Sequence, residues 1–405
     1  MKAIKSILVC LLSSFSLLSV VSCGEVVSSD SSSGLSVQSS SSSGEDSSSI
    51  HSPITIADML GRKVSVDVDN VNNVVCIGAG ALRLYSYING VNKLSGVEDI
   101  DNPSANSVLN KQFASSPRPY YMVYGDSVKR LPSCGKGGPQ NQAAESELII
   151  SCHPDLIFSE YEDATLADNL QNATDTPVLV MKYDSSSIFG DSLYGSLRMI
   201  GKAVSKEERA EELINYITSA KNDLNNRTKD IQDSDKPSVY LGCLGNWGVQ
   251  DIYMTCKDYP LFSMDNIRNA ADDVLTVNGF QNIDIEKFLT LDADKIIIDA
   301  SGVSKFRATY NADKERFDNL KAFQDGEIYL QLPYNNYYTN IEVALMDAYY
   351  DAKAVYPAEF EDMDIEAKSN EISEIFLGKA LYKDMSGLPN SYGGFQKINV
   401  SEFFK

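Results

Sequence analysis

The sequence predicts an α/β fold in two halves with one long helix between them. Three observations support this: strand-like and helix-like patterns alternate along the chain, one long helical pattern stands in the middle, and a short motif occurs once in each half. Continuous apolar runs that alternate with amphipathic helices are typical of parallel strands buried on both faces. Several such runs lead into loops of glycine, serine or asparagine, and we expect strands at Val74–Ile77, Leu156–Phe158, Val178–Met181, Val239–Leu241, Lys295–Ile298 and Ile328–Gln331.

The middle of the chain, residues 205–231, predicts a single long helix. Ser205 and Glu208 have the spacing of a capping box, in which a serine and a glutamate three residues later bond each other's backbone amides. Apolar residues then recur every three or four positions, as on one face of a helix. About 26 residues at 1.5 Å each would span roughly 40 Å. We expect this helix to brace the two halves, although an ordinary surface helix fits the pattern equally well.

A short motif occurs once in each half. Residues 147–158 and 286–297 both read as a short helix, a tight turn and an apolar strand. Each motif begins with a glutamate and has an aspartate eight positions later. The two halves are therefore expected to be related in structure, although no longer repeat links their sequences.

The first 22 residues predict a bacterial lipoprotein signal peptide. Lys2 and Lys5 form a basic start, and the apolar run at 7–21 is shorter than the roughly 20 residues that span a bilayer. Small or branched apolar residues then precede Cys23, where we expect cleavage and attachment of lipid to sulfur. An ordinary secretory signal with a chance cysteine is the alternative. Residues 23–53 are rich in serine and are expected to form a flexible tether.

The remaining residues, 54–405, are enough for two domains of ordinary size. The formal net charge is −21, and loss of Lys2 and Lys5 with the signal would make it −23. So acidic a surface argues against binding to nucleic acid and against adsorption to anionic lipid. No other segment is apolar enough to cross a membrane, so we expect the lipid on Cys23 to be the only membrane anchor. An odd number of cysteines remains after the anchor, so they cannot all pair: Cys76, Cys134, Cys152, Cys243 and Cys256.

The order of these motifs resembles the class III solute-binding proteins of ABC importers for iron–siderophore, haem and cobalamin. Residues 54–64 look like the first hairpin of that family, and residues 74–84 look like its first strand and helix. Leu131–Gly135 then precedes the motif at 147–158, and the resemblance covers residues 54–378. Two departures are Ala293, where the family usually has proline, and a tail at 379–405 that the resemblance does not place.

The resemblance implies two three-layer α/β lobes, at 54–204 and 233–378, joined by one rigid helix at 205–232. A ligand would lie in the cleft between the lobes, and the helix would limit closure to a small rotation. It also implies a monomer that delivers a chelated-metal solute to the permease and ATPase of an ABC importer. Iron–siderophore is the expected solute, and haem or cobalamin are the alternatives.

Ligands of parallel α/β lobes meet the loops at the carboxyl ends of strands. The strongest candidate is a run of three tyrosines and two asparagines after the last strand, since aromatic faces and amide groups suit a large ring-rich ligand. A packing role within one lobe is the alternative for each aromatic. The candidate ligand residues are Gly78, Gly80, Lys136, Tyr161, Asn246, Trp247, Tyr334, Asn335, Asn336, Tyr337 and Tyr338.

Glu147 and Glu286 stand at matching places before the two strand motifs. The resemblance implies that one surface glutamate per lobe pairs with arginines of the permease, and charge pairs of this kind steer docking and fix register. Two solvated acids at helix starts, favoured by the helix dipole, are the alternative.

The sequence gives little support for enzyme chemistry or for metal binding. Gly78 and Gly80 follow a strand as in a dinucleotide fingerprint, but Arg83 occupies the third glycine position. The sequence shows no nucleophile with a histidine partner and no histidine–cysteine cluster with metal-ligand spacing, so we expect no catalytic residue, no metal site and no cofactor. A surface lipoprotein that captures a ligand or a protein without a transporter remains the main rival reading. We expect an exported protein anchored to a bacterial membrane.

Overall fold

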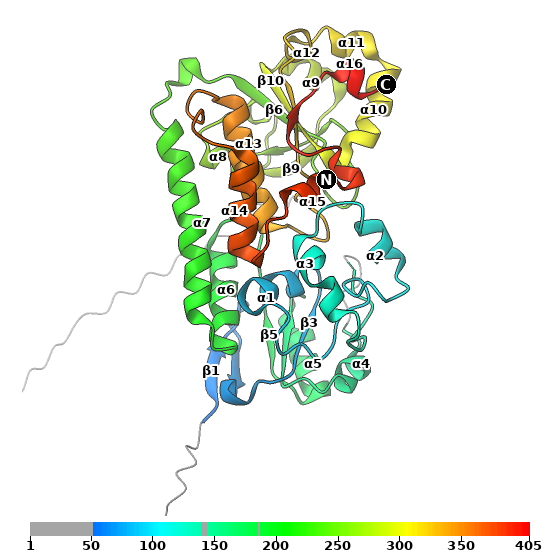
Figure 1. The fold of residues 1–405 in the computed structure, drawn as a ribbon, viewed down its shortest axis with the longest axis vertical. Helices are drawn as coiled ribbons and strands as arrows, with labels where there is room; N and C mark the ends of the chain where they lie inside the picture. The colour runs from blue at the N-terminus through cyan, green and yellow to red at the C-terminus, as the bar shows by residue number, and fades with distance from the viewer. Residues whose placement is uncertain (1–51, 139–143, 185–186) are drawn as a thin grey trace, which may run out of the picture. The chain divides into compact units, whose positions relative to one another are not determined.

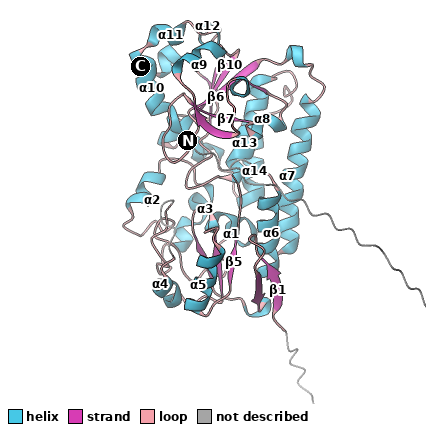
Figure 2. Ribbon diagram, turned by 180° about the vertical axis from the view of Figure 1, so that it is seen from behind, coloured by secondary structure: helices cyan, strands magenta, loops and turns pink. Residues whose placement is uncertain are grey.

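Parallel strands form the centre of each lobe in the computed structural model, which describes residues 52–138, 144–184 and 187–405. The predicted signal peptide, the lipid site at Cys23 and most of the tether lie outside the described residues. Residues 51–405 form one compact unit. The two lobes with their helices are seen in Figure 1, and the strands stand out in Figure 2.

The N-terminal lobe begins with an antiparallel hairpin of β1 (Ile54–Ala57) and β2 (Lys63–Val66), as predicted. Its main sheet has the order β3 (Val74–Ile77), β4 (Leu156–Ser159), β5 (Val178–Val180), and all three strands are parallel. Alternate residues of β3 face two different apolar clusters, one with Val74 and Cys76 and the other with Val75 and Ile77. The sheet is therefore covered on both faces, by α1 (Ala81–Asn89), α2 (Val108–Phe113), α3 (Pro119–Val128), α4 (Ser146–Ser151), α5 (Ala164–Thr174) and α6 (Asp191–Ala203).

The C-terminal lobe has a five-stranded sheet in which all pairs are parallel except the one at the β12 edge. Its order is β12 (Gln396–Lys397), β11 (Ile328–Gln331), β10 (Lys295–Asp299), β6 (Ser238–Gly242), β8 (Arg268–Asn269). A two-stranded antiparallel sheet of β7 (Met254–Lys257) and β9 (Gly279–Asn282) lies beside it. The helices are α8 (Pro260–Met264), α9 (Ile285–Leu291), α10 (Val303–Ala312), α11 (Lys314–Asp318), α12 (Lys321–Gln324), α13 (Ile341–Val355), α14 (Ile365–Leu377), α15 (Tyr382–Ser386) and α16 (Val400–Phe403). Single 3-10 turns lie at Val68–Asn70, Asp233–Asp235, Ala270–Asp273, Ala300–Gly302 and Pro389–Ser391. All six predicted strands are confirmed, with ends within two residues of the prediction.

The long helix α7 (Glu207–Thr228) runs alongside both lobes (Figure 1). It is shorter than predicted, about 33 Å for its 22 residues. The predicted capping box is wrong: Ser205 has the left-handed φ of 56°, so the helix starts after it with Lys206 at the N-cap and no side-chain cap. Early in α7, Glu211 pairs with Arg198 of α6 at 2.6 Å, and late in α7, Arg227 pairs with Asp362 at 2.7 Å. Its two ends are thus fixed to different lobes, as a brace requires.

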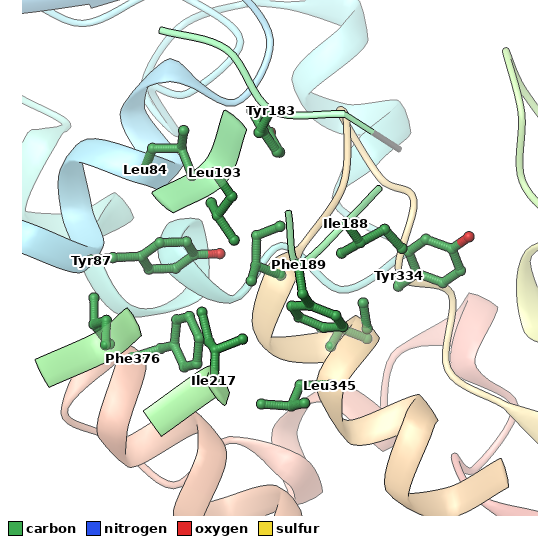
Figure 3. Packing of buried hydrophobic residues seen from close by; sticks show 14 of the residues in the cluster. Leu84, Tyr87, Tyr183, Ile188, Phe189, Leu193, Ile217, Tyr334, Leu345 and Phe376 are labelled. Carbon is green, nitrogen blue, oxygen red and sulfur yellow. The ribbon is translucent and has the colours of Figure 1, made fainter. Parts of the chain in front are cut away.

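A single apolar cluster continues from one lobe into the other. Figure 3 shows it between α1, α7, α13 and α14, with Tyr87, Ile217, Leu345 and Phe376 among its members. The rings of Tyr87 and Phe376 meet edge to face at 5.0 Å. Beside them the Tyr87 hydroxyl donates to the buried carboxylate of Glu342 on α13. The lobes therefore share part of their core and are joined by more than the chain connection.

The tail that the resemblance did not place completes the C-terminal lobe. Its strand β12 adds an antiparallel edge to the main sheet, and Phe404 is buried against Phe306. Before β12, Asn390 reaches the other lobe: its backbone amide donates to the carbonyl of Ser115 at 2.9 Å. The tail is thus part of the fold and a second tie between the lobes.

None of the helices found in 52–138, 144–184 and 187–405 combines the length and apolar character needed to cross a membrane. The five cysteines of these segments are all buried and unpaired.

Candidate ligand site at the lobe seam

The loop after β11 crosses to the N-terminal lobe and forms what we call the lobe seam, between residues 334–340 and the loops after β3, β4 and β5. Tyr337 and Tyr338 both have left-handed φ angles, 53° and 68°. A non-glycine residue with left-handed backbone angles costs about 1–3 kcal/mol of folding free energy, and it persists where neighbouring contacts fix it. Here the side-chain amide of Asn336 supplies such contacts, because it donates to the carbonyls of Phe113, Ser116 and Pro117, each at 3.0 Å.

Arg83 of α1 is the centre of the seam and is fully buried. Its guanidinium donates to Asn340 Oδ1 at 3.0 Å and to the hydroxyl of Tyr183 at 2.7 Å. It also donates to the backbone carbonyls of Asn336 and Tyr337, at 3.0 and 2.8 Å. All of these acceptors are neutral, and no ion pair to Arg83 occurs among the described residues. This cation is therefore satisfied by the contact between the lobes.

Tyr337 joins the seam to a buried acid. Its hydroxyl donates to Glu98 Oε2 at 3.2 Å and accepts from the amide of Gly138 at the same distance. The Glu98 carboxylate also accepts from the amide of Gly78 at 3.2 Å. Burial, helped by the nearby charge of Asp101, raises the pKa of Glu98 to about 8, and the bonds from Gly78 and Tyr337 oppose that rise. Glu98 therefore holds a proton at neutral pH in the closed seam.

Tyr338 packs on Tyr183 across the seam. The rings meet edge to face at 4.6 Å, and the Tyr338 hydroxyl donates to the Tyr183 carbonyl at 2.9 Å. Gly80 lies under the Tyr183 hydroxyl so closely that a Cβ at this position would be only 1.8 Å from that oxygen. The predicted glycine loop is thus needed for the approach of Tyr183 and Arg83 to the backbone.

Glu160 and Tyr161 follow β4 and lie against Gly78, whose missing Cβ would be 3.2 Å from an atom of each. The hydroxyl of Tyr161 is buried and has no hydrogen-bond partner among the described residues. Burial, followed by the charge of Glu162, raises the pKa of Glu160 well above its usual value. Glu162 itself pairs with Lys182 at 2.8 Å. This edge of the seam is thus formed by acids and phenols.

The other predicted ligand residues differ in how far their side chains are exposed. Asn335 joins two C-terminal-lobe loops, since its amide donates to the carbonyl of Gly245 at 3.0 Å. Next to that carbonyl, Asn246 is half-buried and Trp247 is 79% exposed. Lys136 is exposed, and Tyr334 is fully buried within the core cluster (Figure 3). The structure therefore brings Gly78, Gly80, Tyr161, Asn336, Tyr337 and Tyr338 together at the seam, and the ligand role of all these residues stays a prediction.

A cavity of about 260 Å³ lies beside the seam, between α3 and the segment that Asn336 holds. Aromatic and apolar side chains form much of its wall, and Leu388 of the tail closes one side. Buried Arg118 also lines it and is stacked 4.0 Å from the ring of Tyr121. None of the predicted ligand residues contributes to this cavity.

Among the seam residues that were not predicted from the sequence are Arg83, Glu98, Tyr183 and Asn340. Arg83 was noted only because it interrupts a glycine fingerprint. The available signal was a charged residue inside an apolar strand-to-helix segment, which must find partners if it is buried. The remaining contacts join residues up to 257 positions apart, and no local pattern reports such pairs.

The two glutamates of the short motifs occupy equivalent places. Glu147 is in the first turn of α4 and Glu286 is in the first turn of α9, and both are exposed. Leu148 and Ile150 beside Glu147 are 38% and 44% exposed. In the described segments, no group of three histidine, cysteine or acidic side chains is arranged to hold a metal ion.

Comparison with known proteins agrees with this architecture. Residues 110–332 match the family described as periplasmic binding protein. An uncharacterised ABC transporter substrate-binding lipoprotein of Bacillus subtilis, YvrC, is 26% identical over 176 residues, which are 43% of this chain and 53% of that protein. The chain thus spans about half the length of this relative.

Two solved structures show the same fold. The molybdate-binding protein MolA of Haemophilus influenzae, solved with molybdate, has a TM-score of 0.60 at 18% identity, over 81% of this chain and 98% of that one. A periplasmic solute-binding protein of Veillonella parvula has a TM-score of 0.63 at 18% identity, over 86% and 98% of the two chains. The family match covers more than half of the chain, and these structures have its arrangement of lobes. The chain therefore belongs to the periplasmic binding protein family and has the two-lobed fold of class III solute-binding proteins.

Proposed function

We propose that this protein is a lipid-anchored substrate-binding protein that captures a chelated metal, preferably an iron–siderophore, and delivers it to the permease of an ABC importer. The observation that carries the proposal is the lobe seam, where aromatic and polar side chains of both lobes meet at the carboxyl ends of parallel strands. Haem and cobalamin are the alternative solutes. Membership of the family and the relative in Bacillus subtilis support the transport role.

Trp247 offers a direct test of solute binding. It is the only tryptophan, it is 79% exposed, and it lies in the loop after β6, two residues from the Gly245 carbonyl that Asn335 bonds, so its fluorescence reports on this region alone. We expect a ferric siderophore to quench this emission and to raise the melting temperature, since a ligand that binds only the folded state stabilises it. Trp247→Ala should keep the melting temperature of the free protein and weaken binding by about tenfold. A flat response to ferric siderophores, haem and cobalamin alike would refute the proposal.

Glu147 and Glu286 are proposed to dock the protein on the permease. Both are exposed at equivalent turns of the two lobes, and the apolar Leu148 and Ile150 beside Glu147 suit a protein interface. The double variant Glu147→Gln and Glu286→Gln should reduce uptake of solute in cells at least about tenfold and leave its affinity in solution unchanged. Glu207→Gln with Glu315→Gln, two other exposed acids, is the matched control. Normal uptake by the docking variant would show that these residues have another role.

Cys23 is proposed to carry the lipid that keeps the protein near the permease, in preference to a receptor that works without a transporter. Cys23→Ser should abolish incorporation of radiolabelled palmitate and release the protein from the membrane fraction. Membrane retention of this variant would contradict a lipid anchor at this position.

A further inference from the structure

The cavity beside the seam contains a buried donor without a partner. Arg118 forms part of the cavity wall and is only 1% exposed, and its Nε–H finds no acceptor among the described residues. A buried N–H without an acceptor costs free energy, and an acceptor that a ligand supplies removes that cost. This cavity thus combines volume for a ligand with a donor that lacks a partner.

The two sides of the Arg118 guanidinium differ in their contacts. Nη1 is occupied, since it donates to the carbonyl of Ile100 at 3.0 Å and lies 3.4 Å from the carboxylate of Asp101. Nη2 has only a 3.5 Å contact with Asn110 Oδ1, an atom that already accepts from the hydroxyl of Tyr121 at 2.8 Å. The edge formed by Nε and Nη2 is therefore nearly free. A carboxylate fits such an edge with two parallel N–H···O bonds.

The start of α3 also favours a negative charge at this cavity. Arg118 is the N-cap residue of α3, and no side chain caps the helix. Tyr121, in the first turn, lines the cavity with it. The N-terminus of a helix carries a partial positive charge that stabilises a nearby anion. Asp126 is the acid in the wall, but its side chain is 92% exposed and pairs with Lys129 at 3.1 Å, so its charge is screened by solvent.

The rest of the wall determines the size and character of the ligand. Phe113, Met122, Val123 and Leu388 provide apolar surface. The volume of about 260 Å³ lies below the roughly 300–1,000 Å³ of pockets that hold drug-sized ligands. A whole ferric chelate, haem or cobalamin is therefore too large for this cavity. The ligand that fits is a small molecule with an apolar chain or ring.

We propose that this cavity is a binding site for a small monocarboxylate with an apolar or aromatic body, which Arg118 holds through Nε and Nη2. The site is separate from the seam, because the residues proposed to bind the transported solute do not line it. Its wall comes from both lobes, since Leu388 belongs to the tail and Asn390 of the same segment donates to the hydroxyl of Ser116 at 2.9 Å. A bound carboxylate therefore also holds the tail against the N-terminal lobe.

Benzoate, benzamide and acetate form a matched set of probes. Benzoate has both the carboxylate and the ring, benzamide keeps the ring without the charge, and acetate keeps the charge without the ring. In isothermal titration calorimetry, we expect benzoate to bind with a dissociation constant of about 1 mM or lower, and the other two to bind at least about tenfold more weakly. Benzoate should also raise the melting temperature, because it binds the folded state.

Three variants locate the bound probe. Arg118→Lys keeps the positive charge and removes the Nε–Nη2 edge, so it should weaken benzoate binding at least about tenfold. Ala114→Phe keeps Arg118 and fills the cavity from an exposed position in its wall, so it should weaken binding to a similar extent. Arg130→Lys, at an exposed arginine outside the cavity, should leave binding unchanged. The melting temperature of each variant without ligand checks that it folds.

The outcomes separate this site from the proposed transport function. No measurable binding of benzoate, equal binding of benzoate and benzamide, or unchanged benzoate affinity in the two cavity variants would overturn the site and leave the transport role as it stands. If Arg118→Lys does not fold, Ala114→Phe decides, because unchanged affinity in that variant places the probe elsewhere. A protein that binds benzoate in the cavity but no iron chelate, haem or cobalamin would keep this site and lose the proposed function.

Discussion

Tyr337 shows how much a single hydroxyl group can contribute to the seam. It is 3% exposed, its backbone has a left-handed φ, and its hydroxyl is the only group of the loop that reaches Glu98 in the described structure. The side chain thus serves as donor to one buried group and acceptor from another. Its removal takes one bond from Glu98, which keeps the amide of Gly78, and takes from the Gly138 amide the partner that the structure shows.

Tyr337→Phe should therefore lower the free energy of unfolding by about 1–2 kcal/mol, the cost of leaving buried polar groups unpaired. Urea unfolding followed by circular dichroism measures this change. Tyr392→Phe, at a half-buried tyrosine outside the seam, should change stability by less than about 0.5 kcal/mol. Equal effects of the two substitutions would mean that the Glu98 contact adds nothing to stability.

At the scale of elements, the tail stabilises the C-terminal lobe by filling part of its core. Phe404 at the end of α16 is 4% exposed and packs edge to face on Phe306 at 5.1 Å, whereas its neighbour Phe403 is half-buried. The tail therefore belongs to the core although it lies beyond the part of the chain that the family resemblance covers.

Phe404→Ala should cost about 3–4 kcal/mol, as for a large aromatic removed from a packed core. Phe403→Ala, one position earlier, should cost about 1 kcal/mol and serves as the control for loss of a ring in the same helix. Chemical denaturation gives both values. A smaller loss for Phe404 than for Phe403 would contradict the packing described here.

Buried acids in and around α13 make the stability of this lobe depend on pH. Four acids are fully buried: Asp347 and Asp351 of α13, Asp265 after α8, and Asp299 at the end of β10. Burial raises the pKa of Asp299 to about 7, and burial with the charge of neighbouring aspartates raises the pKa of the other three. Each carboxyl thus holds its proton more tightly in the folded state than in the unfolded chain.

Because the folded state binds these protons more tightly, stability should fall as pH rises from about 4 to 7 and beyond. The urea midpoint should be higher at pH 5 than at pH 8. Asp351→Asn, which keeps the shape and removes the titration, should flatten this slope. Asp362→Asn, at a side chain that is 70% exposed and paired with Arg227, should leave the slope in place. A midpoint that rises with pH would show that these acids are ionised in the fold.

At the scale of the whole body, the shared core sets how far the lobes can move. The cluster around Tyr87, Ile217 and Phe376 belongs to both lobes, and α7 pairs with elements of each. Opening the seam by a large rotation would expose apolar surface at a cost of about 25 cal/mol per Å². Small rotations that keep this cluster intact do not carry that cost.

We therefore expect X-ray scattering curves with and without a saturating ligand to show no resolvable change in the radius of gyration. Crystal structures of the two states should differ by a small rotation about the apolar cluster. A clear compaction on addition of ligand would show that the brace does not limit closure.

The sequence predicted the strands well because continuous apolar runs such as Val74–Ile77 report burial on both faces directly. It also predicted the loop at 334–338 as the special region, since three tyrosines after a strand are unusual. It could not predict Arg83 as the centre, because its partners lie 100 to 257 positions away. It missed β12 because a strand of two residues has no detectable period. The predicted helix cap is wrong for a local reason: the backbone of Ser205 has a left-handed φ just before α7 begins.

The edge strand β12 has a consequence for association between molecules. It pairs with β11 through two residues and so occupies part of the hydrogen-bonding edge of that strand. Unpaired strand edges are templates for pairing with another chain. Without β12, this edge of the sheet would be open to a strand of a second molecule.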